Sequence, residues 1–247
     1  MKKIVYIDIG THFGQEFQSM FGSGRAFSWK MFRRFVAYFL LRKGEKISIK
    51  YLMKLMKGRK NLKKIRNDFL FYFVEANPKI INFCDVYKNA HGVFNCALNG
   101  EQKVSVANLF LANEELLGQG SSIFLSKNNV TESHSVPTLG VPSKVFFAAF
   151  KSHLDKVVAE YLVILRLNCE GVEDDVIYSA HEVFGNDLTL VMGSLKDVLE
   201  CKGEGAYVSL LNYLDDRGLP FIKFSELITS WAEAHSSVNA LHGEYLQ

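Results

Sequence analysis

Short apolar runs recur along this chain, and most of them lead into stretches with helical periodicity. Runs of this length that are apolar throughout are typical of strands covered on both faces of a sheet. The expected strands are 3–9, 70–76, 92–98, 160–168, 188–192 and 220–224. The expected helices cover about 77–88, 172–183, 205–217 and 225–235.

Strands that alternate with helices predict parallel pairing, with helices on both faces of the sheet. We therefore expect one α/β domain over residues 1–247, with a doubly wound and mostly parallel sheet. Ligands in this fold class bind at the carboxyl ends of the strands, near the point where the strand order reverses. The residues just after each strand are thus the candidates for a functional site.

The first crossover is much longer than the others. About 60 residues separate the first two strands, where a crossover helix needs about a dozen. Segments 27–44 and 49–65 both have a helical pattern. In the second, we expect Leu52, Leu55 and Met56 on one face and the lysines on another. The sequence thus predicts a helical insertion, a lid or an interaction element, over 15–68.

This insertion concentrates the positive charge of the chain. Residues 15–68 hold 15 Lys and Arg against three acids, whereas the remainder holds 14 against 23. Such asymmetry favours an anionic partner: an anionic sugar or glycan, a membrane face contacted through 27–44, or nucleic acid. A solvated basic face and a homodimer contact stay open as alternatives. The residues that we expect to bind an anionic acceptor are Arg33, Arg34, Arg59 and Lys60.

Other features of the composition indicate a cytoplasmic protein. No apolar run approaches the 18 or so residues that a membrane span needs. Asp8 interrupts the apolar stretch after Lys2 and Lys3 too early for a signal peptide. The four cysteines form no Cys-x2-Cys pair, so we expect reduced, buried thiols.

The loop after the first strand reads Asp8-Ile9-Gly10-Thr11-His12-Phe13-Gly14. Gly10 permits a tight turn, and Gly14 lets the next helix pack closely. The loop lacks the middle glycine of the dinucleotide fingerprint and the Lys-Ser/Thr of a phosphate-binding loop. An acid before the glycine disfavours a phosphate and suits a ligand with a cationic end.

Polar side chains also end two other strands. Glu75 can accept hydrogen bonds from the two hydroxyls of a ribose. Asn168 and Glu170 are expected to point the same way, toward the centre of the cleft. Glu173 is interpreted as an acid that favours the positive end of a helix dipole.

These motifs together resemble the FkbM family of class I S-adenosylmethionine-dependent methyltransferases. The resemblance covers about 3–14 and 70–185, and the motifs stand in the family's order. They are VYIDIGTHFG, FYFVEANP, FNCALNG, the Gly-Ser-Ser of GQGSSIF, and ILRLNCEGVEDDVIYSA. The basic insertion lies outside the resemblance.

The resemblance implies a seven-stranded sheet that binds S-adenosylmethionine, and O-methylation of a sugar, glycan or other small polar acceptor. It places Glu75 at the ribose, Ala97 and Leu98 near the adenine, and Asn168 and Glu170 beside the methyl group. The complete set of expected cofactor residues is Asp8, Gly10, Thr11, Gly14, Glu75, Ala76, Ala97, Leu98 and Asn168.

Methyl transfer to an alcohol needs a group that takes the proton. Glu170 is the first candidate, followed by His12 on the glycine loop and His134 in a later loop. Ser121 and Ser122 are expected to hydrogen-bond the acceptor, although a plain turn would also explain them. No set of metal ligands has convincing spacing.

Two departures from the family pattern keep other functions open. Asn168 stands where the family usually has Asp, and an amide cannot act as a base. Gly193-Ser194 ends the fifth strand, where a Glu and a His are expected. A cofactor-binding module without catalysis is therefore one alternative. A nucleic-acid methyltransferase is the other, although the Asn/Asp-Pro-Pro-Tyr/Phe motif of enzymes that methylate base nitrogens is missing.

Overall fold

The computed structural model describes residues 2–22, 31–32, 49–81, 85–112, 120–224 and 228–246. Its main sheet has six parallel strands in the order β3-β2-β1-β7-β8-β9. These strands are β1 (Lys2–Ile9), β2 (Phe69–Val74), β3 (Gly92–Phe94), β7 (Glu160–Leu167), β8 (Leu188–Gly193) and β9 (Phe221–Lys223). A smaller sheet, in the order β4-β6-β5, consists of β4 (Ala97–Asn99), β5 (Ser105–Phe110) and β6 (Ser135–Pro142).

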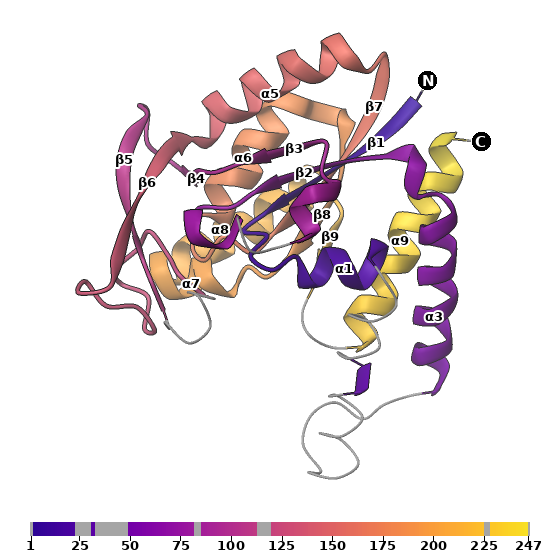
Figure 1. Cartoon of the computed structure of the whole chain (residues 1–247), viewed down its shortest axis with the longest axis horizontal. Helices are drawn as coiled ribbons and strands as arrows, with labels where there is room; N and C mark the ends of the chain where they lie inside the picture. The colour runs from indigo at the N-terminus through magenta and orange to yellow at the C-terminus, as the bar shows by residue number, and fades with distance from the viewer. Residues whose placement is uncertain are drawn as a thin grey trace.

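Helices cover both faces of the main sheet (Figure 1). One face packs against α5 (Ser143–Val157), α6 (Glu173–Phe184), α7 (Lys196–Lys202) and α8 (Glu204–Asp216). The other packs against α1 (Gln15–Phe21), α3 (Ile49–Lys64), α4 (Pro78–Ile81) and α9 (Ile228–Leu246). Three short 3-10 helices are η1 (Arg66–Asp68), η2 (Asp85–Asn89) and η3 (Gly185–Asp187).

The strands are apolar throughout because both of their faces are covered. In β1, Val5 and Ile7 belong to the core under α5 and α6, whereas Ile4 and Tyr6 belong to the core under α1 and α9. The same alternation in β2 and β7 divides the apolar side chains between two cores, each shielded from water. The α/β class and the parallel sheet predicted from these runs are confirmed.

The prediction of seven strands is wrong, because the main sheet has six within the described part of the chain. The chain that follows β9 forms the 19-residue helix α9, which packs along α3. This helix also extends well beyond the expected 225–235. Trp231, Ala234 and Val238 recur at helical spacing and are fully buried, so packing on α3 stabilises this stretch as a helix.

The expected strand 92–98 is instead two strands that belong to different sheets. The side-chain amide of Asn95 donates to the carbonyl oxygen of Glu75 at 2.8 Å, and the chain leaves the main sheet there. β3 therefore pairs with β2, and β4 pairs with β6. The expected helix 77–88 is likewise divided into α4 and η2, with 82–84 outside the described residues.

Apart from the short helices η1 and η3, four elements of the described chain have no counterpart among the sequence predictions: β5, β6, α5 and α7. β6 holds two prolines and a glycine, and several of its side chains are exposed. Its pattern therefore lacks the apolar run that identifies a strand of the main sheet. In the expected helix 49–65, Leu55 is buried as predicted, but Met56 lies on the exposed face with the lysines.

Most of segment 27–44 lies outside the described residues, and so do Arg33 and Arg34. Within the part that is described, the structure has no helix both long and apolar enough to span a bilayer.

Candidate functional site

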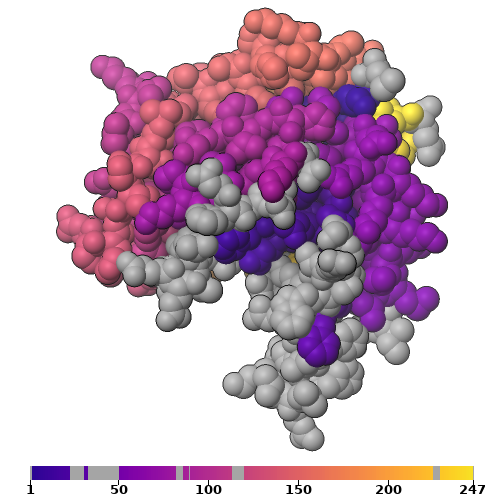
Figure 2. All heavy atoms as spheres, in the orientation of Figure 1, coloured from indigo at the N-terminus to yellow at the C-terminus, as the bar shows by residue number. Residues whose placement is uncertain are grey.

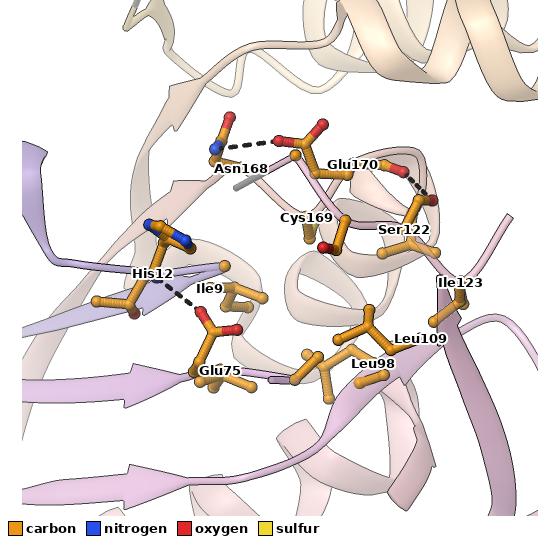
Figure 3. Close-up of a pocket in the computed structure, with 18 of the residues that line it drawn as sticks. Ile9, His12, Glu75, Leu98, Leu109, Ser122, Ile123, Asn168, Cys169 and Glu170 are labelled. Carbon is orange, nitrogen blue, oxygen red and sulfur yellow. Dashed lines mark hydrogen bonds between the residues drawn. The ribbon is translucent and has the colours of Figure 1, made fainter. Parts of the chain in front are cut away.

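A pocket lies at the carboxyl ends of β1, β2 and β7 (Figure 3). The strand order reverses between β1 and β7, which is where doubly wound folds bind ligands. The space free of atoms is about 790 Å³, its open mouth included. Its walls comprise residues 9–13, 15–16, 74–76, 96–98, 109, 120–123, 168–170 and 172.

The glycine loop after β1 lies directly against the end of β7. Gly10 has φ +72°, and a side chain there would overlap the carbonyl oxygen of Asn168. The Gly10 N–H donates to the carbonyl oxygen of Val74 at 2.9 Å. The Thr11 hydroxyl donates back to the carbonyl oxygen of Asp8 at 2.8 Å. Close approach of three strand ends thus requires glycine at position 10.

Asp8 lies beneath this loop and does not line the pocket. Its carboxylate accepts a hydrogen bond of 2.8 Å from the Arg166 guanidinium, which also pairs with Glu16 at 3.1 Å. Burial raises the pKa of the Asp8 carboxyl, and the charge of Arg166 opposes that shift. The cation that the acid before the glycine was expected to attract is therefore supplied by the chain itself.

Glu75 follows β2 and does line the pocket. One carboxylate oxygen accepts the His12 N–H at 2.6 Å, and the other accepts the Asn77 N–H at 2.8 Å. A carboxylate has about four acceptor positions, so the two backbone bonds leave capacity for a ligand diol. Burial raises the pKa of the Glu75 carboxyl, while the two backbone donors act in the opposite direction.

Asn168 and Glu170 lie across the pocket from Glu75 (Figure 3). The Asn168 amide donates to the Glu170 carboxylate at 3.4 Å. That carboxylate also pairs with Lys127, whose ammonium lies 3.2 Å from Asp197. Ser122 donates to the Glu170 carbonyl oxygen at 2.6 Å. Glu170 is thus held through its side chain and its backbone.

Two residues at the site have a backbone conformation that is rare without glycine. His12 has φ 48° and Glu170 has φ 60°. His12 is held by the Tyr87 hydroxyl, which donates to its carbonyl at 2.5 Å, and by Glu75, which accepts its N–H. The backbone of Glu170 is held by Glu173, which accepts its N–H, and by Ser122, which donates to its carbonyl. Strain of this kind concentrates at functional sites.

Glu173 secures the loop that carries Glu170. Its carboxylate accepts the N–H groups of Cys169, Glu170 and Gly171 at 3.0, 2.7 and 2.8 Å. The residue is fully buried at the start of α6, which confirms its position at the positive end of that helix. Burial raises its pKa to about 7. Asp174, also in this turn, pairs with Lys202 instead, at 2.6 Å.

One side of the pocket wall is apolar. Leu98 from β4, Leu109 from β5 and Ile123 from the following loop gather along one side (Figure 3). Ser122 bridges to Phe110, which brings the loop 120–123 against this wall. Cys96 completes the wall as a neutral thiol, because burial raises its pKa to about 11. A flat apolar group fits this side.

The charged side chains that line the pocket are all carboxylates: Glu16, Glu75 and Glu170. Among the described residues, no lysine or arginine belongs to the lining. Arg166 pairs with Glu16, and Lys127 pairs with Glu170, although neither cation lines the pocket. The pocket therefore favours a neutral or cationic ligand over a phosphate.

The structure brings together most of the residues that the sequence indicated. Those that line the pocket are Gly10, Thr11, His12, Glu75, Ala76, Ala97, Leu98, Ser121, Ser122, Asn168 and Glu170. Gly14, which precedes α1 and has φ +61°, does not line the pocket. It packs against Val86 of η2. His134 lies in an exposed turn and does not line the pocket.

Arg59, expected at an acceptor, is buried beside the end of α1 instead. It donates to the carbonyl oxygens of Ser19 and Gly22 at 2.9 and 2.7 Å. Sequence reasoning missed the contributions of Glu16, Leu109 and Lys127. Leu109 and Lys127 belong to β5 and to the loop before β6, which carry no strong pattern. Glu16 had one usable signal, its position in the first turn of the helix after the glycine loop.

No protein-family model, no curated protein and no solved structure matches the chain.

Proposed function

We propose that the pocket binds S-adenosylmethionine and that the chain transfers its methyl group to a hydroxyl of a small polar acceptor, such as a sugar or glycan. One observation carries the proposal. A carboxylate at the end of β2 stands beside an apolar wall, in a pocket whose charged lining is acidic throughout the described part of the chain. The resemblance to the FkbM family supports the same function.

A nucleoside matches both Glu75 and the apolar wall beside it. Its ribose hydroxyls are donors, and the Glu75 carboxylate has acceptor capacity left for them. The adenine ring is flat and largely apolar, and the side formed by Leu98, Leu109 and Ile123 would take it. Glu75 and this wall lie on the same side of the pocket (Figure 3).

The positive end of the cofactor matches the acidic lining. S-adenosylmethionine carries a sulfonium and an ammonium group and supplies a methyl group already activated by the positive sulfur. Glu16 and Glu170 would present carboxylate oxygens to that end, while Arg166 and Lys127 pair with the same two groups.

The residues across from Glu75 are assigned to the acceptor. Glu170 is the group that we expect to take the proton of the acceptor hydroxyl, because its carboxylate lines the pocket. Asn168 cannot take a proton, but its amide can orient Glu170, to which it donates at 3.4 Å. Alignment of acceptor and methyl group would supply much of the rate.

A dinucleotide is the second candidate, on the evidence of the strand order. The order of the main sheet and an acid at the end of β2 also occur in NAD-binding folds. Against this, His12 replaces the middle glycine of the fingerprint, and carboxylates line the place that a pyrophosphate would need.

Calorimetric titration of S-adenosylhomocysteine and of NAD into the protein tests the proposal. We expect micromolar binding of S-adenosylhomocysteine, weakened at least tenfold by Glu75→Gln, and no binding of NAD. Glu233→Gln is the matched control, because Glu233 is exposed on α9 and does not line the pocket. Binding of NAD alone would favour the dinucleotide. Equal binding of S-adenosylhomocysteine to both variants would contradict the assigned orientation.

A further inference from the structure

The outer face of α3 carries an uncompensated row of lysines. The helix contains no aspartate or glutamate. Its six lysines are all exposed: Lys50, Lys54, Lys57, Lys60, Lys63 and Lys64. With 16 residues at 1.5 Å each, the helix is about 24 Å long. α3 forms one flank of the molecule (Figure 2).

None of these six lysines has a salt bridge to a carboxylate among the described residues. Elsewhere on the surface such pairs are common: Lys144 pairs with Glu182 at 2.5 Å, and Lys151 pairs with Asp155 at 3.1 Å. The α3 lysines therefore present their positive charge to solvent without a paired carboxylate among the described residues, which would attract an anionic partner.

Two large apolar side chains lie among these lysines. Met53 is 68% exposed and Met56 is 53% exposed. At 100° per residue, Met53 falls between Lys60 and Lys64, and Met56 falls between Lys60 and Lys63. We call this surface, the six lysines with the two methionines, the α3 basic face. On this surface the two exposed methionines are surrounded by lysines, so apolar and positively charged side chains lie next to each other.

The α3 basic face cannot turn inward to bury its methionines. Leu55 and Leu62 on the opposite side of the helix are fully buried in the core shared with α9. A side chain at Gly58 would press on His235 of α9, and the Asn239 amide donates to the Gly58 carbonyl at 3.0 Å. Arg59 joins the same helix to the end of α1. The outward orientation is thus fixed by packing.

We propose that the α3 basic face docks on an anionic phospholipid surface. At a bilayer interface, methionine side chains enter the boundary between headgroups and acyl chains, and lysines extend their ammonium groups to the lipid phosphates. A nucleic acid would use the lysines but would gain little from two exposed methionines. The combination of both residue types therefore favours the lipid surface.

This proposal is independent of the proposed function, because no residue of the α3 basic face lines the pocket. Each lysine near an anionic membrane surface increases binding about fivefold. Removal of three should therefore weaken binding about 100-fold, provided that all three contact the surface together.

Cosedimentation of the full chain with vesicles tests the proposal. One set of vesicles is pure phosphatidylcholine, and the other contains about a third phosphatidylserine. The charge variant is K54Q/K57Q/K60Q, and the apolar variant is M53Q/M56Q. The matched control is K103Q/K156Q/K196Q, which removes the same charge from exposed lysines outside α3. Glutamine keeps the helix propensity of lysine and methionine, and circular dichroism checks that each variant folds.

We expect the protein to bind the anionic vesicles and not the neutral ones. The charge variant should lose binding about 100-fold, the apolar variant at least fivefold, and the control less than fivefold. Equal loss in the two triple variants would overturn the proposal, because net charge alone would then explain binding. Unchanged vesicle binding by the apolar variant, together with salt-sensitive binding of RNA, would assign the surface to nucleic acid instead. Absence of binding to anionic vesicles would also overturn it.

Discussion

Asp8 and Arg166 occupy register-paired positions on the neighbouring parallel strands β1 and β7, and their side chains form a buried ion pair at 2.8 Å. The pair lies directly under the glycine loop, since Arg166 also donates to the carbonyl oxygen of Gly10 at 3.1 Å. One guanidinium group therefore contacts both the Asp8 carboxylate in the main sheet and the glycine loop that lines the pocket. Its removal should affect both stability and ligand binding.

Arg166→Met should destabilise the protein by about 3–5 kcal/mol, because it leaves the Asp8 carboxylate buried without its cation. Asp8→Asn combined with Arg166→Met should recover part of that loss, because the uncompensated charge is then gone. Urea unfolding of the wild type, the single variant and the double variant measures both changes. A double variant no more stable than Arg166→Met would show that the carboxylate charge is not the cause.

Gly10→Ala and Gly205→Ala form a matched pair. The first places a methyl group against the Asn168 carbonyl at φ +72°, so we expect a loss of more than about 2 kcal/mol. The second adds a methyl group in open space within α8, so we expect a gain of about 0.5–1 kcal/mol. Thermal unfolding distinguishes the two. Similar effects from both would contradict the close approach of the β1 loop and β7.

Glu173→Ala should loosen the loop that carries Glu170. The change leaves three backbone N–H groups without their acceptor, at an expected cost of about 2–4 kcal/mol. Hydrogen exchange should accelerate at the amides of Cys169, Glu170 and Gly171. Asp175→Ala is the control. It removes another acid of the same helical turn, one that pairs with Lys202 and not with the loop. Unchanged exchange at these three amides would refute the assigned role.

His235 should make the stability of the α3–α9 pair depend on pH. Burial lowers the pKa of this imidazole to about 3, and the charge of Arg59 adds to the shift. The unfolded chain binds a proton below about 6.5, whereas the folded chain does not until about 3. Stability from this residue is therefore present above pH 6.5. It falls by about 1.4 kcal/mol for each pH unit as the pH drops from about 6 toward 3.

His235→Leu removes this titration and replaces the imidazole with an apolar side chain of similar size. Between pH 6 and 4, its free energy of unfolding should vary less steeply with pH than that of the wild type. The difference in slope corresponds to about one proton taken up on unfolding. Urea denaturation at a series of pH values measures both slopes. Parallel pH profiles would mean that His235 accepts a proton in the folded state as readily as in the unfolded chain.

The apolar runs of the sequence determined the central strands, since a strand covered on both faces must be apolar along its whole length. For the same reason, the polar residues that end β2 and β7, Glu75 and Asn168, could be placed at the ligand end of the sheet before its strand order was known. α3 could also be identified locally, from lysines and leucines at helical spacing.

Only the tertiary structure decided the remaining features. β5 and β6 have weak local patterns, and their pairing in a second sheet brings Leu109 and the loop 120–123 to the pocket. The ion pair between Arg166 and Asp8 depends on the register of β7 beside β1, which no local pattern gives. The length of α9 depends on packing against α3, which lies far away in sequence. Local sequence patterns indicate which residues are buried and which are exposed. Packing between distant segments determines which side chains are in contact.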